Sequence, residues 1–534
     1  MTTVIPRYTP TTIEIKQFPR PARLTDLDDA DGAILVCDSE RLRASEADFP
    51  YFRFLKHQFM RRFGDVIVTT PRSLDLPNKC STRLTVFGLS PKLSAFALLS
   101  LCRTAVAQQR EFNPRVLTLC LVDLEPEANT RVLAALAASL HAALHSLPSF
   151  KSKRDQPKQL AFVRAVGMPT AIDLRRAVAV AHGNNLARHF TALPPNRLTP
   201  GAYRDQIRVL AKARGWRMTV LDTKKLQKIG AGAFLAVAQG SNNPDASIIR
   251  LEYRPKRRAA SAPHVALVGK GICFDTGGNN LKPAKFMHGM HEDMQGSAVA
   301  LGTLWTLTEL AYPHPVDCWV ALAENMIGPA AYKQNDIFTA CNGTTIEIIH
   351  TDAEGRMVLA DTLALAARTN PSMIIDYATL TGSCIGALGT RYSGVFTNRN
   401  DWTWALAAAG ERSGERVWPF PADDDYAEAL VSHVADVKQC TLDNNADHIL
   451  AALFLKRFIG QTPWIHLDLA AGNHPGGLAH IPTDITGFGV GFSTEFLIDR
   501  DNATDAGPGS PASAHARARK QKRKRHTSKG RPRR

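Results

Sequence analysis

The sequence predicts an α/β protein with two such domains, and three observations carry this prediction. The chain has 534 residues, which is too long for one ordinary hydrophobic core. Hydrophobic residues make up 44% and charged residues 21%, as in globular proteins. Short apolar runs alternate with segments whose apolar residues have helical spacing. We expect an N-terminal α/β domain (1–170), a larger α/β domain with a mixed, helix-covered sheet (171–500) and a disordered basic tail (501–534).

The N-terminal domain is predicted from buried strands that alternate with helices. We expect strands at 33–37, 84–89, 116–124 and 159–166, and helices at 93–109 and 130–145. The charged stretch 148–158 contains two prolines and predicts an exposed loop. This part of the sequence has no carboxylate cluster, nucleotide-binding loop or nucleophile motif, so we expect the chemistry in the second domain.

The second domain begins with a predicted helix at 172–191 and a turn-rich connection at 192–203. Further helices are expected at 222–234 and 296–310. Continuous apolar runs predict strands at 264–274, 316–325, 372–380 and 464–470. Such runs suit a sheet that is covered on both faces.

Charge and cysteine usage indicate a compartment and a class of partner. The net charge is +16, but eleven Lys or Arg residues lie within 516–534, which leaves only +5 for the rest of the chain. No apolar run is long enough for a membrane helix, and no secretory signal is visible, so we expect no membrane partner. Nine scattered cysteines without a C-x-x-C pair favour reduced thiols, and we expect a cytoplasmic protein.

The basic tail suggests a second function class. A run of Lys and Arg without acids binds nucleic acid or another acidic surface by releasing counterions, with steep salt dependence. The run has no interleaved aromatic residue on which a base would stack. A solvated tail without a specific partner is an equally weighted alternative.

The stretch HTDAEGRMVLAD, residues 350–361, places Asp352, Glu354 and Arg356 at every second position. On extended backbone these side chains face the same way. Two adjacent carboxylates repel each other unless a cation lies between them. An isolated D-x-E is more often a solvated turn, so this stretch alone is weak evidence for a metal site.

A second group of charged residues strengthens the prediction. The stretch GKGICFDTGGNNLKP contains Lys270, Asp275 and Lys282 around a glycine-rich turn, and MHEDMQG adds Glu292 and Asp293. These residues follow a predicted strand, and α/β domains place their sites at the carboxyl ends of strands. Oxygen ligands suit Zn²⁺, Mn²⁺ or Mg²⁺, and bridging carboxylates allow two ions about 3.5–4 Å apart to share an activated water.

Several motifs taken together resemble those of a known family. VGKGICFDTGGNNLKP, MHEDMQG, AENMIGPAAY, HTDAEGRMVLAD, DYATLTGS and ITGFGVG resemble, in order and spacing, the motifs of the leucyl (cytosol) aminopeptidase family. The similarity is close over 265–492 and only general in the first 170 residues. It implies a metallo-exopeptidase that releases N-terminal amino acids, leucine and other apolar residues, from peptide substrates. It also implies a cytoplasmic homohexamer.

The resemblance implies two divalent metal ions per subunit, Mn²⁺ or Zn²⁺, with Mg²⁺ as a further candidate. The implied ligands of the tighter metal are Lys270, Asp275, Asp293 and Glu354. Those of the exchangeable metal are Asp275, Asp352 and Glu354.

The resemblance also implies roles for residues around the metals. Lys282 is expected to polarise the scissile carbonyl. Arg356 is expected to hold a bicarbonate ion that acts as general base. The residues expected to line the pocket for the first side chain are Met290, Thr379, Leu380 and Gly382.

The chain departs from the family pattern at a few positions. His350 replaces the usual Asn of the signature, and we expect a tolerated structural exchange. Asn279 and Asn280 are expected to be neutral because Asn accepts left-handed turn geometry. Glu292 is expected to add an acid near the metals.

Four further polar residues are expected to be satisfied structural groups rather than ligands: Asp361, Asp376, His466 and Asp468. All implied ligands are present, which favours an active enzyme over the alternative of a nucleic-acid-binding or scaffold protein on an inactive aminopeptidase fold.

Overall fold

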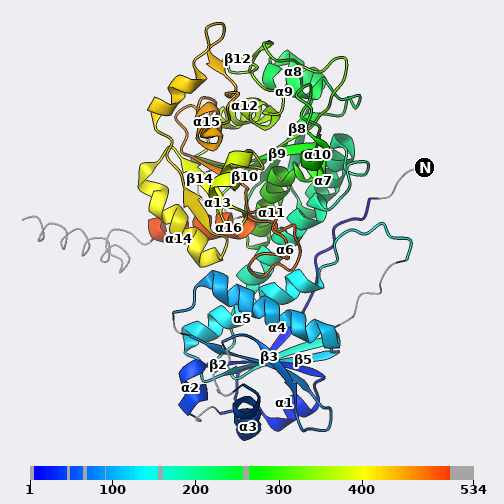
Figure 1. The fold of residues 1–534 in the computed structure, drawn as a ribbon, viewed down its shortest axis with the longest axis vertical. Helices are drawn as coiled ribbons and strands as arrows, with labels where there is room; N and C mark the ends of the chain where they lie inside the picture. Colours follow the sequence, from blue (N-terminus) through cyan, green and yellow to red (C-terminus); the bar gives the residue numbers. More distant parts are fainter. Residues whose placement is uncertain are drawn as a thin grey trace, which may run out of the picture.

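The computed structural model describes residues 5–44, 48–63, 69–90, 92–153, 160–256 and 264–505. Two lobes are visible in Figure 1: the smaller contains the first part of the chain, blue to cyan, and the larger contains the rest, green to red. Both are α/β, as predicted. Helix α16 (Val490–Asp505) includes the first five residues of the tail expected at 501–534. The rest of that segment, with the basic run at 516–534, lies outside the described residues, so the expectations about it remain predictions.

The smaller lobe is built on a six-stranded sheet in the order β1-β6-β5-β2-β4-β3. Neighbouring strands are parallel except β3 and β4, which are antiparallel. The strands are β1 (Ile15–Phe18), β2 (Gly32–Asp38), β3 (Arg72–Asp75), β4 (Arg83–Leu89), β5 (Val116–Val122) and β6 (Phe162–Val166). The four predicted strands are present, and the edge strands β1 and β3 were missed because each has only four residues and neither forms a continuous apolar run.

Helices cover both faces of this sheet. The helices are α1 (Leu24–Asp28), α2 (Ser39–Ala44), α3 (Phe52–Phe63), α4 (Ala95–Phe112) and α5 (Pro126–Leu144). Alternate residues of β2 point to opposite faces. Ile34 and Val36 belong to the core formed with α4 and α5, whereas Leu35 belongs to the core formed with α1 and α3.

The larger lobe contains a mixed eight-stranded sheet in the order β15-β14-β17-β13-β9-β10-β8-β7. Its strands are β7 (Arg217–Asp222), β8 (Ser247–Tyr253), β9 (Val265–Asp275), β10 (Val316–Asn325), β13 (Met373–Ala378), β14 (Ser393–Thr397), β15 (Val417–Pro419) and β17 (Trp464–Asp468). The central strands β17, β13, β9 and β10 run parallel. Since β9 is followed by β10 on one side and later by β13 on the other, the strand order reverses at β9.

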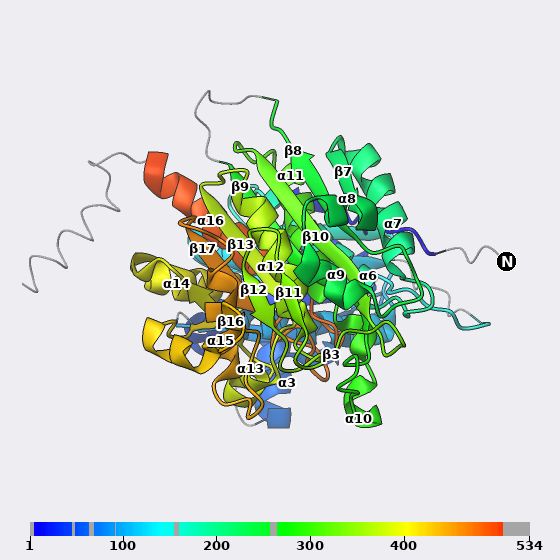
Figure 2. The same cartoon turned by 90° about the horizontal axis from the view of Figure 1, so that it is seen from above.

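Helices also cover both faces of the larger sheet, which Figure 2 shows from above with the smaller lobe behind it. Residues of α6, α11, α14 and α16 form one core with the sheet, and residues of α9, α12 and α15 form the other. The helices are α6 (Arg175–Thr191), α7 (Pro200–Arg214), α8 (Thr223–Lys228), α9 (Gly232–Ala238), α10 (Ala284–Met287), α11 (Gln295–Glu309), α12 (Glu354–Ala367), α13 (Gly382–Leu388), α14 (Thr403–Ser413), α15 (Asp447–Lys456) and α16 (Val490–Asp505).

Short elements complete the larger lobe. A small sheet contains β11 (Ile337–Thr339), β12 (Thr345–Glu347) and β16 (Val437–Lys438), and the 3₁₀ turns are η1 (Met290–Glu292), η2 (Asn400–Trp402) and η3 (Asp424–Leu430). The prediction of one helix at 222–234 was wrong. The chain forms α8 and α9 instead, because Gly230 adopts a left-handed φ of 71° that ends the first helix.

Helix α6 connects the two lobes. Asn185 Nδ2 donates a hydrogen bond to the carbonyl of His141 in α5 at 3.1 Å. Arg188 Nη1 donates to the carbonyl of Ala142 at 3.3 Å. The predicted domain boundary at residue 170 falls between β6 and α6, and it stays a prediction. Within the part of the chain that the structure describes, no helix is long and apolar enough to cross a membrane.

A buried ion-pair network stabilises the larger sheet and gives a testable prediction. Asp317 in β10 has a fully buried side chain that pairs with Arg250 at 2.6 Å and with Arg254 at 2.7 Å. Burial alone would raise the pKa of Asp317, but His264 and Arg254 lower it from 3.8 to about 2. We expect Asp317→Asn to reduce the free energy of unfolding at neutral pH by about 2–4 kcal/mol, since it leaves the arginines without their buried partner.

The pH dependence follows from the lowered pKa. The stabilisation by Asp317 is fully present above the unfolded-state pKa and is lost as pH falls through the folded-state pKa. Denaturant unfolding at a series of pH values should therefore show the wild-type and variant curves converging in acid. Asp173→Asn removes an exposed carboxylate paired with Arg175 and should change nothing measurable. A constant difference at every pH would contradict this account.

Candidate metal centre

The carboxyl ends of four parallel strands meet at one edge of the larger sheet. Asp275 is the last residue of β9, Asn325 of β10 and Asp468 of β17, and Thr379 directly follows β13. Because the strand order reverses at β9, a crevice is expected beyond its end. Asn325 Nδ2 and the Gly277 amide each donate to Asp275 Oδ1 at 2.8 Å, which fixes that carboxylate.

Two further carboxylates lie at the same edge of the sheet, and each belongs to a residue at or just before the start of a helix. Asp293 lies between η1 and α11, and Glu354 is the first residue of α12, where the helix dipole favours a negative charge. The extended geometry expected for 352–356 was wrong because the helix begins at Glu354. The following Gly355 leaves room for a close approach, since a Cβ there would lie 2.6 Å from Lys270 Nζ.

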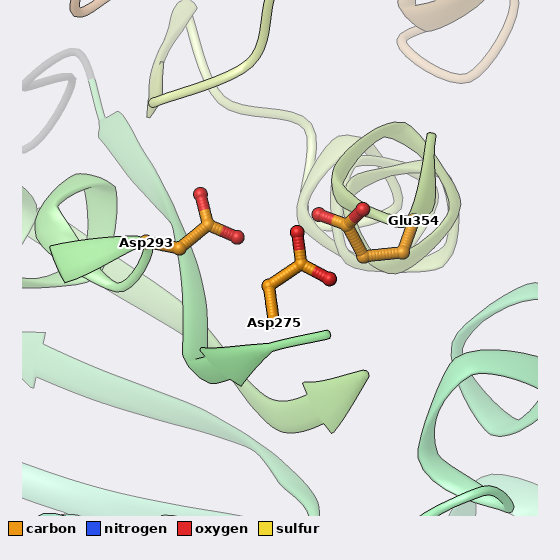
Figure 3. Close-up of side chains that lie close together, drawn as sticks. All are labelled: Asp275, Asp293 and Glu354. Atoms are coloured by element: carbon orange, nitrogen blue, oxygen red, sulfur yellow. The ribbon is translucent and has the colours of Figure 1, made fainter. Parts of the chain in front are cut away.

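The three carboxylates have the arrangement of a metal site. One oxygen from each of Asp275, Asp293 and Glu354 lies within 4.8 Å of the others, and Figure 3 shows the three groups turned toward one another. All three residues are buried. Asp293 Oδ2 is buried and has no hydrogen-bond partner among the residues that the structure describes. Buried carboxylates with an unsatisfied oxygen fit a divalent cation, which prefers oxygen ligands and offsets the like charges.

Two lysines lie among these carboxylates. Lys270 Nζ is 2.8 Å from Asp293 Oδ1 and 2.8 Å from Glu354 Oε1. Burial lowers the Lys270 pKa, but Asp293 and Glu354 outweigh it and raise that pKa above its ordinary value. Lys270 therefore needs an adjacent divalent charge to become a neutral ligand.

The second lysine, Lys282, pairs with Asp275 and with a fourth carboxylate, that of Asp352. Lys282 Nζ is 2.9 Å from Asp275 Oδ2 and 2.6 Å from Asp352 Oδ1. Burial and the neighbouring charges of Glu354 and Asp275 raise the pKa of Asp352 to about 7. The structure thus brings all five expected ligands and Lys282 into one cluster.

Hydrogen bonds hold the turn that carries Asp352. Asn280 Oδ1 accepts from the Thr351 amide at 2.8 Å, and Thr351 Oγ1 donates to the Gly277 carbonyl at 2.6 Å. His350 Nδ1 accepts from the Asp352 amide at 3.2 Å, so the unusual histidine supports the turn. The expected left-handed role of the asparagines was wrong: the positive φ angles belong to Gly277 (87°) and Gly278 (64°).

Glu292 does not join the cluster. Its Oε2 accepts hydrogen bonds from Asn473 Nδ2 at 2.9 Å and Gln295 Nε2 at 3.3 Å. It is absent from the residues that line the cavity. The expectation of an extra acid close to the metals therefore does not hold.

Arg356 has a partner that the sequence did not suggest. Its Nη2 lies 2.8 Å from both oxygens of Asp447, and its Nη1 donates to the Gln439 carbonyl at 3.1 Å. Asp447 begins α15, 91 residues further along the chain. Its only local signal was an acid just before an apolar helical run, which is common at helix starts. The bicarbonate ion that was expected at Arg356 would have to bind the guanidinium group that Asp447 already contacts.

The carboxylates open into a cavity of about 690 Å³. The lining residues that were expected from the sequence are Lys270, Asp275, Lys282, Met290, Asp293, Asp352, Glu354, Arg356, Thr379, Leu380 and Gly382. Further apolar walls come from Phe286, Ile385 and Ala470. Charged side chains therefore form part of the cavity wall, and apolar side chains form another part.

The four polar residues expected to be structural have protein partners. Asp361 accepts from the amides of Phe234 and Cys341. Asp376 accepts from Trp464 Nε1 and pairs with His466 Nδ1, both at 2.6 Å. Asp468 accepts from the Leu380 amide at 3.2 Å and from Thr381 Oγ1 at 2.7 Å. Asp376 thus connects β13 with the neighbouring strand β17, and Asp468 connects the end of β17 with the segment that follows β13.

Comparison with protein families and curated sequences points to one group. Residues 185–493 match the catalytic domain of the cytosol aminopeptidase family. A probable cytosol aminopeptidase of Stutzerimonas stutzeri is 42% identical over 383 residues, covering 70% of this chain and 75% of that protein. The corresponding protein of Roseiflexus castenholzii is 42% identical over 358 residues, covering 67% and 72%.

Solved structures agree with the sequence comparison. The bottromycin maturation enzyme BotP in complex with Mn has a TM-score of 0.74 and 32% identity, covering 88% of this chain and 99% of that one. A mutant of tomato leucine aminopeptidase has a TM-score of 0.80 and 27% identity, covering 91% and 97%. The similarity in structure extends beyond the matched catalytic domain into the first lobe.

Proposed function

The chain belongs to the cytosol aminopeptidase family and is a metal-dependent aminopeptidase, and on this premise we propose that it releases apolar N-terminal residues such as leucine from peptides. The observation that carries the proposal is the cluster of buried carboxylates that line the cavity. Carboxylates that line a cavity suit a substrate whose free, charged terminus binds there.

The donor set fits two divalent ions, and we assign them Mn²⁺ or Zn²⁺. Lys270, Asp275, Asp293 and Glu354 would hold one ion, and Asp275, Asp352 and Glu354 the other. When bound, two such ions acidify a shared water near neutral pH. Support for manganese comes from the related enzyme BotP, which is described as a complex with Mn.

Lys282 would act on the substrate carbonyl. Its side chain is 15% exposed, and it reaches the cavity between Asp275 and Asp352. An ammonium group in that position donates a hydrogen bond to the scissile carbonyl and stabilises the negative charge that develops on its oxygen. Because the carboxylates around it raise the pKa of Lys282 despite burial, the group stays charged.

A blocked substrate tests the proposed exopeptidase action directly. Leucyl anilide has a free α-amine that can reach the carboxylates in the cavity wall, whereas the amine of acetyl-leucyl anilide is blocked. We expect hydrolysis of the first and none of the second. Equal hydrolysis of both compounds would contradict cleavage from the N-terminus.

The apolar wall should set the preferred side chain. Met290 lines the cavity, and Met290→Trp would fill space that a leucyl side chain needs. We expect the leucyl-to-alanyl ratio of kcat/KM to fall roughly 10-fold, since pocket contacts discriminate by amounts of this order. Met287→Trp is a matched control, because Met287 in α10 is not a lining residue. An unchanged ratio in Met290→Trp would remove that residue from the specificity pocket.

Three wider features are proposed with the activity. The names of the curated relatives support a cytoplasmic location. The family resemblance supports a homohexamer, which light scattering coupled to gel filtration would test. The basic segment 516–534 is proposed to bind nucleic acid or another acidic surface, and removing it should abolish any salt-sensitive binding while leaving peptidase activity intact.

A further inference from the structure

The active-site arginine is held by a carboxylate of the chain itself. We propose that Asp447 is the resident anion of Arg356 and takes the place in which the family resemblance implies a bicarbonate ion. The inference rests on the proposed aminopeptidase function, but one of its tests does not need peptidase activity. It makes Asp447 a positioning residue and makes the enzyme independent of bicarbonate.

The contact between the two side chains is close and specific. Arg356 Nη2 lies 2.8 Å from each oxygen of Asp447, and the Arg356 side chain is 2% exposed. A buried guanidinium needs an anion, and here a carboxylate provides it. An external anion at Nη2 would have to displace both of these charge-assisted hydrogen bonds.

The surrounding backbone fixes Asp447 in this position. Asn444 and Ala446, just before it, have left-handed φ angles of 54° and 51°, which side-chain-bearing residues adopt at a cost in strain. The next residue, His448, donates its amide to Ser383 Oγ at 2.8 Å. This loop conformation directs the first residue of α15 toward Arg356.

The segment that carries Asp447 is also tied to the metal turn. Gln439 Oε1 accepts from the amides of Ile349 and His350, and Gln439 Nε2 donates to the Ala353 carbonyl at 3.0 Å. The Gln439 carbonyl in turn accepts from Arg356. The anion and the arginine are therefore held in one framework with Asp352 and Glu354.

Asp447 belongs to the cavity wall. Its side chain is 13% exposed, and it lines the same cavity as Lys282, Asp352 and Glu354. A purely structural ion pair would not need to face that cavity. Asp447 thus places a fixed negative charge next to the reaction site, as a bound external anion would.

The first test compares rates with and without bicarbonate at constant pH and ionic strength. The metal-loaded wild-type enzyme should hydrolyse leucyl anilide equally fast in CO₂-free buffer and with bicarbonate. Asp447→Ala should lose about 10- to 100-fold in kcat and regain most of it with bicarbonate, which enters the space that is opened. Asp447→Asn should lose activity without regaining it, because the amide fills that space.

The second test measures anion binding by thermal unfolding and does not depend on the reaction. Bicarbonate should raise the melting temperature of Asp447→Ala by about 2 °C relative to chloride, and should leave wild type and Asp447→Asn unchanged. A wild-type rate that falls in CO₂-free buffer would overturn the proposal. So would an Asp447→Ala protein that neither binds nor responds to bicarbonate. If no variant has peptidase activity but this shift is present, only the proposed reaction fails.

Discussion

Replacing Glu354 by alanine is expected to reduce kcat/KM by at least about 1000-fold, which corresponds to roughly 4 kcal/mol of transition-state stabilisation. Glu354 is 1% exposed and, like Asp275, is proposed to ligate both metals. Its removal also leaves Lys270 with one carboxylate fewer in a buried site. Both metals should bind more weakly, so kcat/KM and metal content should fall together.

A control variant at another glutamate distinguishes the loss of metal binding from general destabilisation of the protein. Glu309→Gln changes a carboxylate at the end of α11 that pairs with His182 and does not line the cavity. It should leave kcat/KM within a few-fold of wild type. Activity in Glu354→Ala within 10-fold of wild type, at saturating metal, would remove Glu354 from the metal centre.

The second large effect is expected for Lys282→Met. This change keeps the length of the side chain but removes the ammonium group that we propose to stabilise the developing oxyanion. Removing one such donor typically costs about 10²–10³-fold in kcat. KM should change little, because the interaction strengthens in the transition state. Steady-state kinetics with leucyl anilide give both constants.

The metal content of Lys282→Met distinguishes two explanations for a loss of activity in this variant. Lys282 is proposed as an electrophile rather than a ligand, so the variant should keep the wild-type metal content. Lys333→Met, which alters an exposed lysine outside the cavity, should retain full activity. Loss of metal together with loss of rate in Lys282→Met would mean that Lys282 mainly organises the carboxylates.

The central strands could be predicted because burial on both faces leaves a continuous apolar pattern. Strands β9 and β10 are such cases, and nearly every residue in them is buried. Edge strands such as β1 give no such signal, because their burial alternates and they have only four residues. The break between α8 and α9 was missed since a single left-handed glycine, Gly230, ends the first helix within an otherwise helical pattern.

The carboxylate cluster was predictable for a different reason. Its residues lie in three short motifs, and the resemblance assigned them to one site before their distances were known. Asp447 and Gln439 were missed because their partner, Arg356, is 91 and 83 residues away in the sequence. Nothing local distinguishes an acid at the start of a helix that has no further role from one that binds an arginine distant in the sequence.

The most direct test of the metal-centre account measures metal content and leucyl anilide hydrolysis on the same sample. The protein would be stripped with a chelator and reconstituted with Mn²⁺ or Zn²⁺, alongside Asp352→Ala. We expect activity to disappear on stripping and to return as two ions bind per chain, and we expect Asp352→Ala to bind fewer ions and to stay nearly inactive. Full activity in the stripped protein, or in Asp352→Ala, would contradict the metal-centre account.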